Sequence, residues 1–357
     1  AEADITGISF EEDVLANSYI DLNPSYDESQ NAYPIRISVK EGTDMTSLAP
    51  IFELTPGATI SPASGSVQNF TTPVRYTVTS EDKAWHRVYA ITAREQKASN
   101  IPTTYHFEKV RIMQNVWQEF YEEQDSGNEL TWASGNKGFK WAMSEAATED
   151  YPTTQIDNGK TGKCVKLETR LTGDLGNMVG MPIAAGNLFI GSFDMLNAIT
   201  NPLSATRFGT PFYNKPLRLT GYYKYKAGEQ FYENGEYTSR KDIFNIYAIF
   251  YDGVKYDSAG KGTDVTLDGN LPNQNYEHSS MVALALVSNP QETEGDEWKF
   301  FDIPFDYQRY GKKIDEARLA KGEYKIGIIF ASSKDGATFE GAPGSTLLID
   351  EVELIYE

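Results

Sequence analysis

The chain has 357 residues, enough for two or three domains of roughly 100–200 residues each. Acidic residues number 51 and basic residues 32, so the formal net charge is -19, which repels phosphate backbones and disfavours nucleic-acid binding. Cys164 is the single cysteine, so neither an intrachain disulfide nor a cysteine-based zinc site can form. No segment is long and uncharged enough to span a bilayer, and no leader is recognisable at Ala1, which fits a mature or trimmed chain.

Apolar and polar residues alternate along much of the sequence, with Gly and Pro turns between the alternating segments. The clearest examples are residues 74–79, 217–222, 244–251 and 325–330. This pattern is typical of half-buried strands. Helical patterns are scarce, and the best short candidates are residues 110–123 and 314–320. The predicted fold class is therefore all-β, built of β-sandwiches.

A domain boundary is predicted where the composition becomes polar and then reaches Pro102. Residues 1–95 are expected to form a small Ig-like β-sandwich, and residues 96–103 a linker. Residues 104–357 have the length of one large β domain.

Two parts of the chain resemble known families. The segments 52–65, 69–70 and 74–78 resemble an Ig-like module that is common at the N-termini of surface proteins in glycan-foraging Gram-negative bacteria. The remainder resembles the PCMD family, the "putative carbohydrate metabolism domain", in segments 132–139, 151–153, 165–169, 186–191, 221–225, 331–333 and 344–352.

The resemblance implies a jelly-roll sandwich like those of carbohydrate-binding modules. It also implies an exported protein, often lipid-anchored, that lies at the outer membrane, in the periplasm or on the cell surface. It supplies no established reaction. The expected partner is an oligo- or polysaccharide and the expected oligomeric state is a monomer, with a membrane reached only through a lipid anchor.

An aromatic and polar row is the first candidate binding surface. A sugar ring has an apolar C–H face, which an aromatic ring can cover, and a rim of hydroxyls for polar side chains. If Leu219 and Phe250 face the core, alternation places six other residues on the opposite face. They are Arg218, Tyr222, Lys224, Asn245, Tyr247 and Tyr251. The alternative is that these residues lie on the convex sheet or beneath a loop and only cover the core.

Loop residues are the second candidate. Trp132 and Trp141 bracket a Gly- and Asn-rich loop that contains Asn136, and Tyr151 follows soon after. Loops at a sandwich edge often carry function. The alternative is that these large rings plug the end of the sandwich, because Trp is highly buried on average.

Glu108 and Asp350 are the candidate metal ligands. Jelly-roll binding modules often hold a structural Ca²⁺ between the first and last strands, and carboxylates are suitable ligands for it. The alternative is two exposed acids on edge strands. No other cofactor is expected.

The leading hypothesis is a non-catalytic carbohydrate-binding surface protein. A structural or adhesive surface protein is one alternative, and a glycoside hydrolase is another. Hydrolysis needs two carboxyl groups about 5–5.5 Å or 6.5–9.5 Å apart. The acids in or beside predicted strands are Glu168, Asp194, Asp242 and Asp252, and the sequence does not rank their pairs.

Overall fold

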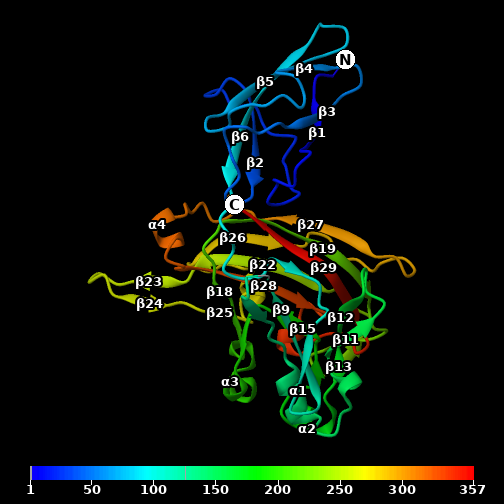
Figure 1. The fold of residues 1–357 in the computed structure, drawn as a ribbon. Helices are drawn as coiled ribbons and strands as arrows, with labels where there is room; N and C mark the ends of the chain where they lie inside the picture. Colours follow the sequence, from blue (N-terminus) through cyan, green and yellow to red (C-terminus); the bar gives the residue numbers. More distant parts are fainter. Residues whose placement is uncertain (1, 125) are drawn as a thin grey trace. The chain divides into compact units, whose positions relative to one another are not determined.

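A computed structural model describes residues 2–124 and 126–357. The chain divides into two compact units between Ala98 and Ser99, with Glu357 grouped with the first. Both units consist mainly of strands in packed sheets (Figure 1), so the all-β sandwich architecture is confirmed. Within the described residues, no helix is both long and apolar enough to cross a membrane.

The smaller unit packs a four-stranded sheet against a two-stranded one. The larger sheet has the order β2-β6-β5-β4, in which β2 and β6 run parallel, and β1 pairs with β3. Tyr76, Ile91 and Phe52 are buried between the two layers. The strands are β1 (Ile5–Ser9), β2 (Tyr33–Val39), β3 (Ile51–Leu54), β4 (Thr59–Ser61), β5 (Val74–Thr79) and β6 (His86–Glu95).

The segment expected as a linker, residues 96–103, is divided between the two units. Gln96 N–H donates to Val39 O at 2.8 Å within the smaller unit. Ile101 is buried in the core of the larger unit.

The larger unit is a sandwich of two antiparallel sheets. The first sheet has the order β11-β12-β29-β19-β27, and β7 also pairs with β29. The second has the order β15-β28-β22-β26, and β18 also pairs with β28. The first comprises β7 (Thr104–Tyr105), β11 (Thr153–Asp157), β12 (Lys163–Glu168), β19 (Pro216–Lys226), β27 (Lys299–Pro304) and β29 (Thr346–Tyr356). The second comprises β15 (Asn187–Phe189), β18 (Thr210–Pro211), β22 (Asn245–Asp252), β26 (Met281–Leu286) and β28 (Tyr324–Ala331).

The core of this sandwich takes alternate residues from both sheets. Leu219 and Tyr223 of β19 meet Ile246 and Phe250 of β22 in one buried cluster. Residues with the opposite parity on these strands therefore point away from the core, on opposite sides of the sandwich.

Shorter strands and helices decorate the sandwich. The strands are β8 (Val110–Met113), β9 (Trp117–Glu123), β10 (Glu129–Thr131), β13 (Arg170–Leu171), β14 (Ile183–Ala184), β16 (Gly191–Phe193), β17 (Thr206–Phe208), β20 (Phe231–Glu233), β21 (Glu236–Thr238), β23 (Val254–Tyr256), β24 (Gly262–Asp264) and β25 (Leu267–Asp268). The helices are α1 (Asn136–Ala142), α2 (Gly173–Met178), α3 (Met195–Thr200) and α4 (Glu316–Leu319), with 3-10 turns at Thr148–Asp150, Pro202–Ser204, Pro272–Gln274 and Gly336–Thr338. In Figure 1, α1, α2 and α3 lie at the same end of the larger unit.

The helix considered for residues 110–123 does not form. This segment is the hairpin of β8 and β9, and its turn contains Gln114 and Asn115 with φ of 50° and 61°. Two consecutive left-handed residues are incompatible with a continuing α-helix. The other candidate, 314–320, does contain α4.

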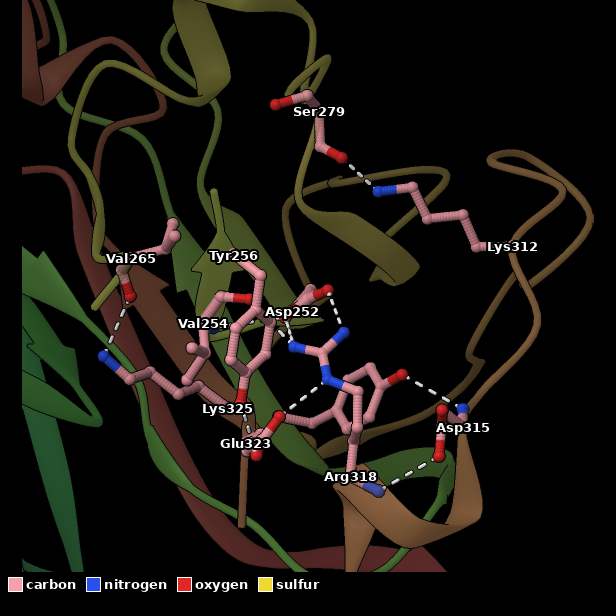
Figure 2. A network of polar contacts seen from close by, with 11 residues as sticks. Asp252, Val254, Tyr256, Val265, Ser279, Lys312, Asp315, Arg318, Glu323 and Lys325 are labelled. Atoms are coloured by element: carbon pink, nitrogen blue, oxygen red, sulfur yellow. Dashed lines mark hydrogen bonds and ion pairs between the residues drawn. The ribbon is translucent and has the colours of Figure 1, made fainter. Parts of the chain in front are cut away.

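Arg318 of α4 is the centre of a polar network at one end of the second sheet (Figure 2). Its guanidinium donates to both carboxylate oxygens of Asp252, at 2.7 and 2.6 Å, and to Glu323 at 2.6 Å. It also donates to Val254 O at 2.8 Å. The hydrogen bond with Asp252 contributes most to raising the pKa of Arg318. The network fastens α4 to the end of β22 and to β23.

Replacing Arg318 by Lys is expected to lower the stability of the larger unit by about 1–2 kcal/mol, because an ammonium group cannot reproduce the fork-shaped set of hydrogen bonds. Differential scanning calorimetry would detect this as a lower Tm. Arg111→Lys is the control, because the ion pair of Arg111 with Glu129 is exposed and its loss should leave the transition unchanged. Equal effects of the two substitutions would contradict the structural role of Arg318.

Candidate ligand-binding site

The alternation along β22 is as predicted, but both faces of the strand are buried. Asn245, Tyr247 and Tyr251 point away from the main core, as the period indicates. Tyr247 and Tyr251 belong instead to a second apolar cluster, which includes Phe208 of β17 and Leu267 of β25. Tyr251 has an exposed fraction of 0% and its phenol donates to Phe208 O at 2.6 Å, so it offers no surface to a ligand.

The three remaining members of the predicted row lie on β19, in the other sheet, so the expectation of one shared face is wrong. Arg218 Nε donates to Asp302 at 2.6 Å, and Lys224 Nζ donates to Asp296 at 2.7 Å. The ammonium of Lys160 lies 4.9 Å from the ring centre of Tyr222. Alternation defines the face of each strand, but it does not say to which sheet a strand belongs.

Three of the four predicted loop residues are buried structural groups. Trp132 is 1% exposed and packs in the main core, 5.0 Å from the ring centre of Tyr105. Tyr151 is 0% exposed, in contact with Phe139. Asn136 is also fully buried. Its Nδ2 donates to Thr153 O at 2.7 Å, and its Oδ1 accepts from Thr153 N at 3.1 Å. None of the three can meet a ligand at the surface.

Trp141, on the last turn of α1, is the exception, because it is 38% exposed and lines a pocket. We call this the α1–α3 pocket. It has a volume of about 170 Å³. Its walls are mainly apolar and include Phe139, Trp141 and Ala142 of α1, Met181, Ile183 and Ala184, Phe193, Met195 and Ala198, and Ala337 and Phe339.

The second sheet supplies part of the lining, from the outward side of β15, β22 and β28. Phe189, Tyr247 and Ile329 contribute apolar surface there, and Asn245 contributes an amide. Asn245 Nδ2 donates to Tyr276 Oη at 2.9 Å. Burial raises the pKa of Tyr247 well above its ordinary value, so its phenol remains a neutral O–H donor. Two members of the predicted row, Asn245 and Tyr247, thus line the same pocket as Trp141, although not at an open surface.

Sequence reasoning did not select the other wall residues. Phe193 ends the short strand β16, Met195 begins α3 and Phe339 follows a 3-10 turn, so none of them belongs to a long regular period. The segment 190–209 between β15 and β18 contains Phe193 and Phe208, and this spacing gives no local signal of a pocket.

A second hollow, of about 730 Å³, shares Phe139 and Ala142 with the first pocket. Its lining includes the acids Glu145, Asp150 and Glu168. Glu168 is half-buried and forms ion pairs with Lys166 at 3.0 Å and Arg170 at 3.1 Å. We call this the acidic hollow.

The other candidate carboxylates serve separate structural tasks. Asp194 caps α3 by accepting from Leu196 N at 2.9 Å. Asp242 is buried, accepts from Ser333 Oγ at 2.6 Å and Ser345 Oγ at 2.7 Å, and has its pKa raised by burial. Asp252 is held by Arg318. Each of these four acids is engaged by a different set of partners.

Glu108 and Asp350 approach the same turn between β11 and β12. Glu108 Oε1 accepts from Lys163 N at 2.7 Å, and Asp350 Oδ2 accepts from Thr161 N at 3.0 Å. Asp350 Oδ1 accepts from Glu351 N at 2.8 Å. Two carboxylates already bonded to amides fit poorly to Ca²⁺, which takes 6–8 oxygen ligands. Among the residues that the structure describes, no group of three or more His, Cys, Asp or Glu is placed to hold a metal.

Both parts of the chain match known families. Residues 106–355 match the family described as "Putative carbohydrate metabolism domain", PCMD. Residues 21–93 match the family described as "SGBP, N-terminal". No curated protein matches the chain.

The solved structures that are similar to this chain include two putative glycoside hydrolases. A putative glycoside hydrolase from Bacteroides thetaiotaomicron VPI-5482 is 45% identical, with a TM-score of 0.65, over 100% of this chain and 97% of its own. A putative glycoside hydrolase from Bacteroides vulgatus ATCC 8482 is 50% identical, with a TM-score of 0.67, over 73% of this chain and 100% of its own.

Replacing Trp132 by Ala is expected to destabilise the larger unit by about 3–5 kcal/mol, because it removes a fully buried ring from the core. Chemical denaturation followed by circular dichroism would measure the loss. Trp141→Ala is the matched control, and its exposed ring should cost less than about 1 kcal/mol. Similar losses in the two variants would show that the burial assignments are wrong.

Stability is expected to depend on the ionisation of Asp350, because burial raises its pKa from 3.8 to about 6. The folded state then binds the proton more tightly than the unfolded state. The resulting contribution is fully present below about pH 3.8 and is lost as the pH rises through about 6. Asp350→Asn removes this titration. The difference between the free energies of unfolding of parent and variant should therefore change between pH 4 and 6, whereas parallel curves would contradict the assignment.

Proposed function

The chain belongs to the family of the putative carbohydrate metabolism domain, and from this premise we propose that it is a non-catalytic glycan-binding protein. The proposed site is the α1–α3 pocket together with its mouth. The proposed partner is an oligo- or polysaccharide bound by a monomer. The match of the smaller unit to the N-terminal region of SGBP, the surface glycan-binding proteins, supports export and a role for that unit as a spacer.

The observation that carries the proposal is the partly exposed Trp141 on an aromatic-lined pocket. An exposed indole face can pack against the C–H face of a sugar ring, and Trp combines large apolar area with a polar N–H. Lys334 lines the same pocket and is exposed, and its ammonium forms no ion pair within the described residues. That ammonium group supplies hydrogen-bond donors for sugar hydroxyls.

The lining of the pocket favours binding over hydrolysis. Among its described lining residues there is no Asp or Glu, whereas glycoside hydrolysis ordinarily needs two carboxyl groups. Affinity is expected to be modest, because a pocket of about 170 Å³ buries little of a sugar chain.

Glycoside hydrolysis is the second candidate function, located in the acidic hollow. It is supported by the names of the two similar structures and by the acids Glu145, Asp150 and Glu168. Glu168 lies between two cations there, with ion pairs to Lys166 at 3.0 Å and Arg170 at 3.1 Å.

Trp141→Ala is expected to weaken glycan binding about 10-fold, because it removes the ring against which a sugar would pack. A glycan array would identify the ligand, and isothermal titration calorimetry would give the Kd of parent and variant. Trp85→Ala is the matched control, since Trp85 is 66% exposed and belongs to the smaller unit.

The same preparation distinguishes the alternatives. Release of new reducing ends, lost in Glu168→Gln, would replace the binding proposal by hydrolysis. Silence of a folded protein across the array would favour a structural or adhesive role. Equal binding by the Trp141 and Trp85 variants would place the site elsewhere.

A further inference from the structure

We propose that the α1–α3 pocket takes a single hydroxyaryl ring, carried as a substituent on the bound glycan. The attachment of the ring to a glycan rests on the proposed function, whereas the preference for a hydroxyaryl ring follows from the pocket alone. Size, wall chemistry and unpartnered polar groups each support it.

The size of the pocket limits its occupant to about one ring. Its volume is about 170 Å³. For comparison, an apolar cavity of about 150 Å³ lined by Leu, Ile and Phe accommodates benzene. A six-membered ring with a small substituent therefore fits, and a disaccharide does not.

The walls disfavour an unsubstituted sugar ring inside the pocket. Phe139, Phe193, Phe208 and Phe339, with Met181 and Met195, form much of the lining. A hexopyranose carries hydroxyls around most of its ring, and each hydroxyl buried without a partner costs about 1–3 kcal/mol. An aryl ring instead presents apolar faces and C–H edges to these side chains, an arrangement that aromatic pairs favour.

The outward face of β22 presents two polar groups to this apolar space. Tyr247 is 2% exposed, and its phenol forms no hydrogen bond within residues 2–124 and 126–357. Asn245 is 4% exposed, and Nδ2 donates to Tyr276, so Oδ1 is left as an acceptor. The two residues share one face of the strand, two positions apart.

Neither Tyr247 Oη nor Asn245 Oδ1 is among the described side-chain atoms that are sealed from solvent without a partner. Both residues line the pocket, so a ligand there can bond to these two oxygens in place of water. One hydroxyl group on the ligand satisfies both residues, because it can accept from the Tyr247 phenol and donate to Asn245 Oδ1. A ring that is apolar except for one hydroxyl is a phenol. Trp141 and Lys334 would meanwhile contact the sugar to which the ring is attached.

The test uses the full chain and small probes that differ by single groups. Ligand-observed NMR and isothermal titration calorimetry would compare 4-methylphenol with toluene, methyl glucoside and 1-hexanol. We expect 4-methylphenol to bind about 10-fold more tightly than toluene, and methyl glucoside not to enter the pocket.

Tyr247→Phe keeps the ring and removes the hydroxyl, so it should lower the preference for 4-methylphenol over toluene, because only the bond to Asn245 Oδ1 remains, while leaving toluene binding unchanged. Ala337→Trp, at an exposed lining position, should block both probes. It also keeps the proposal testable if the Tyr247 variant does not fold.

With the small probes, the inference would be overturned by equal affinity for 4-methylphenol and toluene, by tighter binding of 1-hexanol, by entry of methyl glucoside, or by no effect of Ala337→Trp. Glycan binding that 4-methylphenol does not inhibit would overturn the inference and leave the proposed function standing. Phenol binding without any glycan binding would overturn the proposed function and the glycan as the carrier of the ring, and would leave the ring preference of the pocket standing.

Discussion

Burial of β22 on both faces is the constraint on which the architecture of the larger unit depends. Ile246 and Phe250 tie the strand to the first sheet through the main core. Tyr247 and Tyr251 tie it to the loops that carry β17 and β25. A sandwich strand usually has one solvated face, and here a layer of loops takes the place of solvent. The α1–α3 pocket consequently lies at the end where these helices meet the sheet, and not on an open strand face.

The sheet and the helices contribute different kinds of wall to this pocket. Strand residues such as Tyr247 sit in a continuous hydrogen-bonded ladder and contribute fixed surface. The helices contribute Phe139, Trp141 and Met195 from short elements with fewer backbone restraints. Fixed polar groups on the strand and adaptable apolar groups on the walls suit a ligand with one specific polar contact and a larger apolar body.

Much of the fold could be predicted from the sequence, because alternation reports directly which side chains share a face. The grouping of strands into sheets could not, since β19 and β22 have the same period yet lie on opposite sides of the core. Trp132 and Trp141 lie only nine positions apart, but Trp132 meets Phe330 from a distant strand, whereas Trp141 ends a short helix. Such long-range contacts leave no local signal, and they decided which predicted residues reach the site.

The short helices of the site have a consequence for how its specificity can evolve. α1, α2 and α3 contain 7, 6 and 6 residues, below the length at which isolated helices are stable in water. They are held by local anchors, such as the amide of Asn136 on Thr153 and the Asp194 cap of α3. Provided these anchors are kept, residues on the pocket side can be exchanged without altering either sheet. Relatives that share the sandwich are therefore free to differ in the shape and chemistry of this pocket.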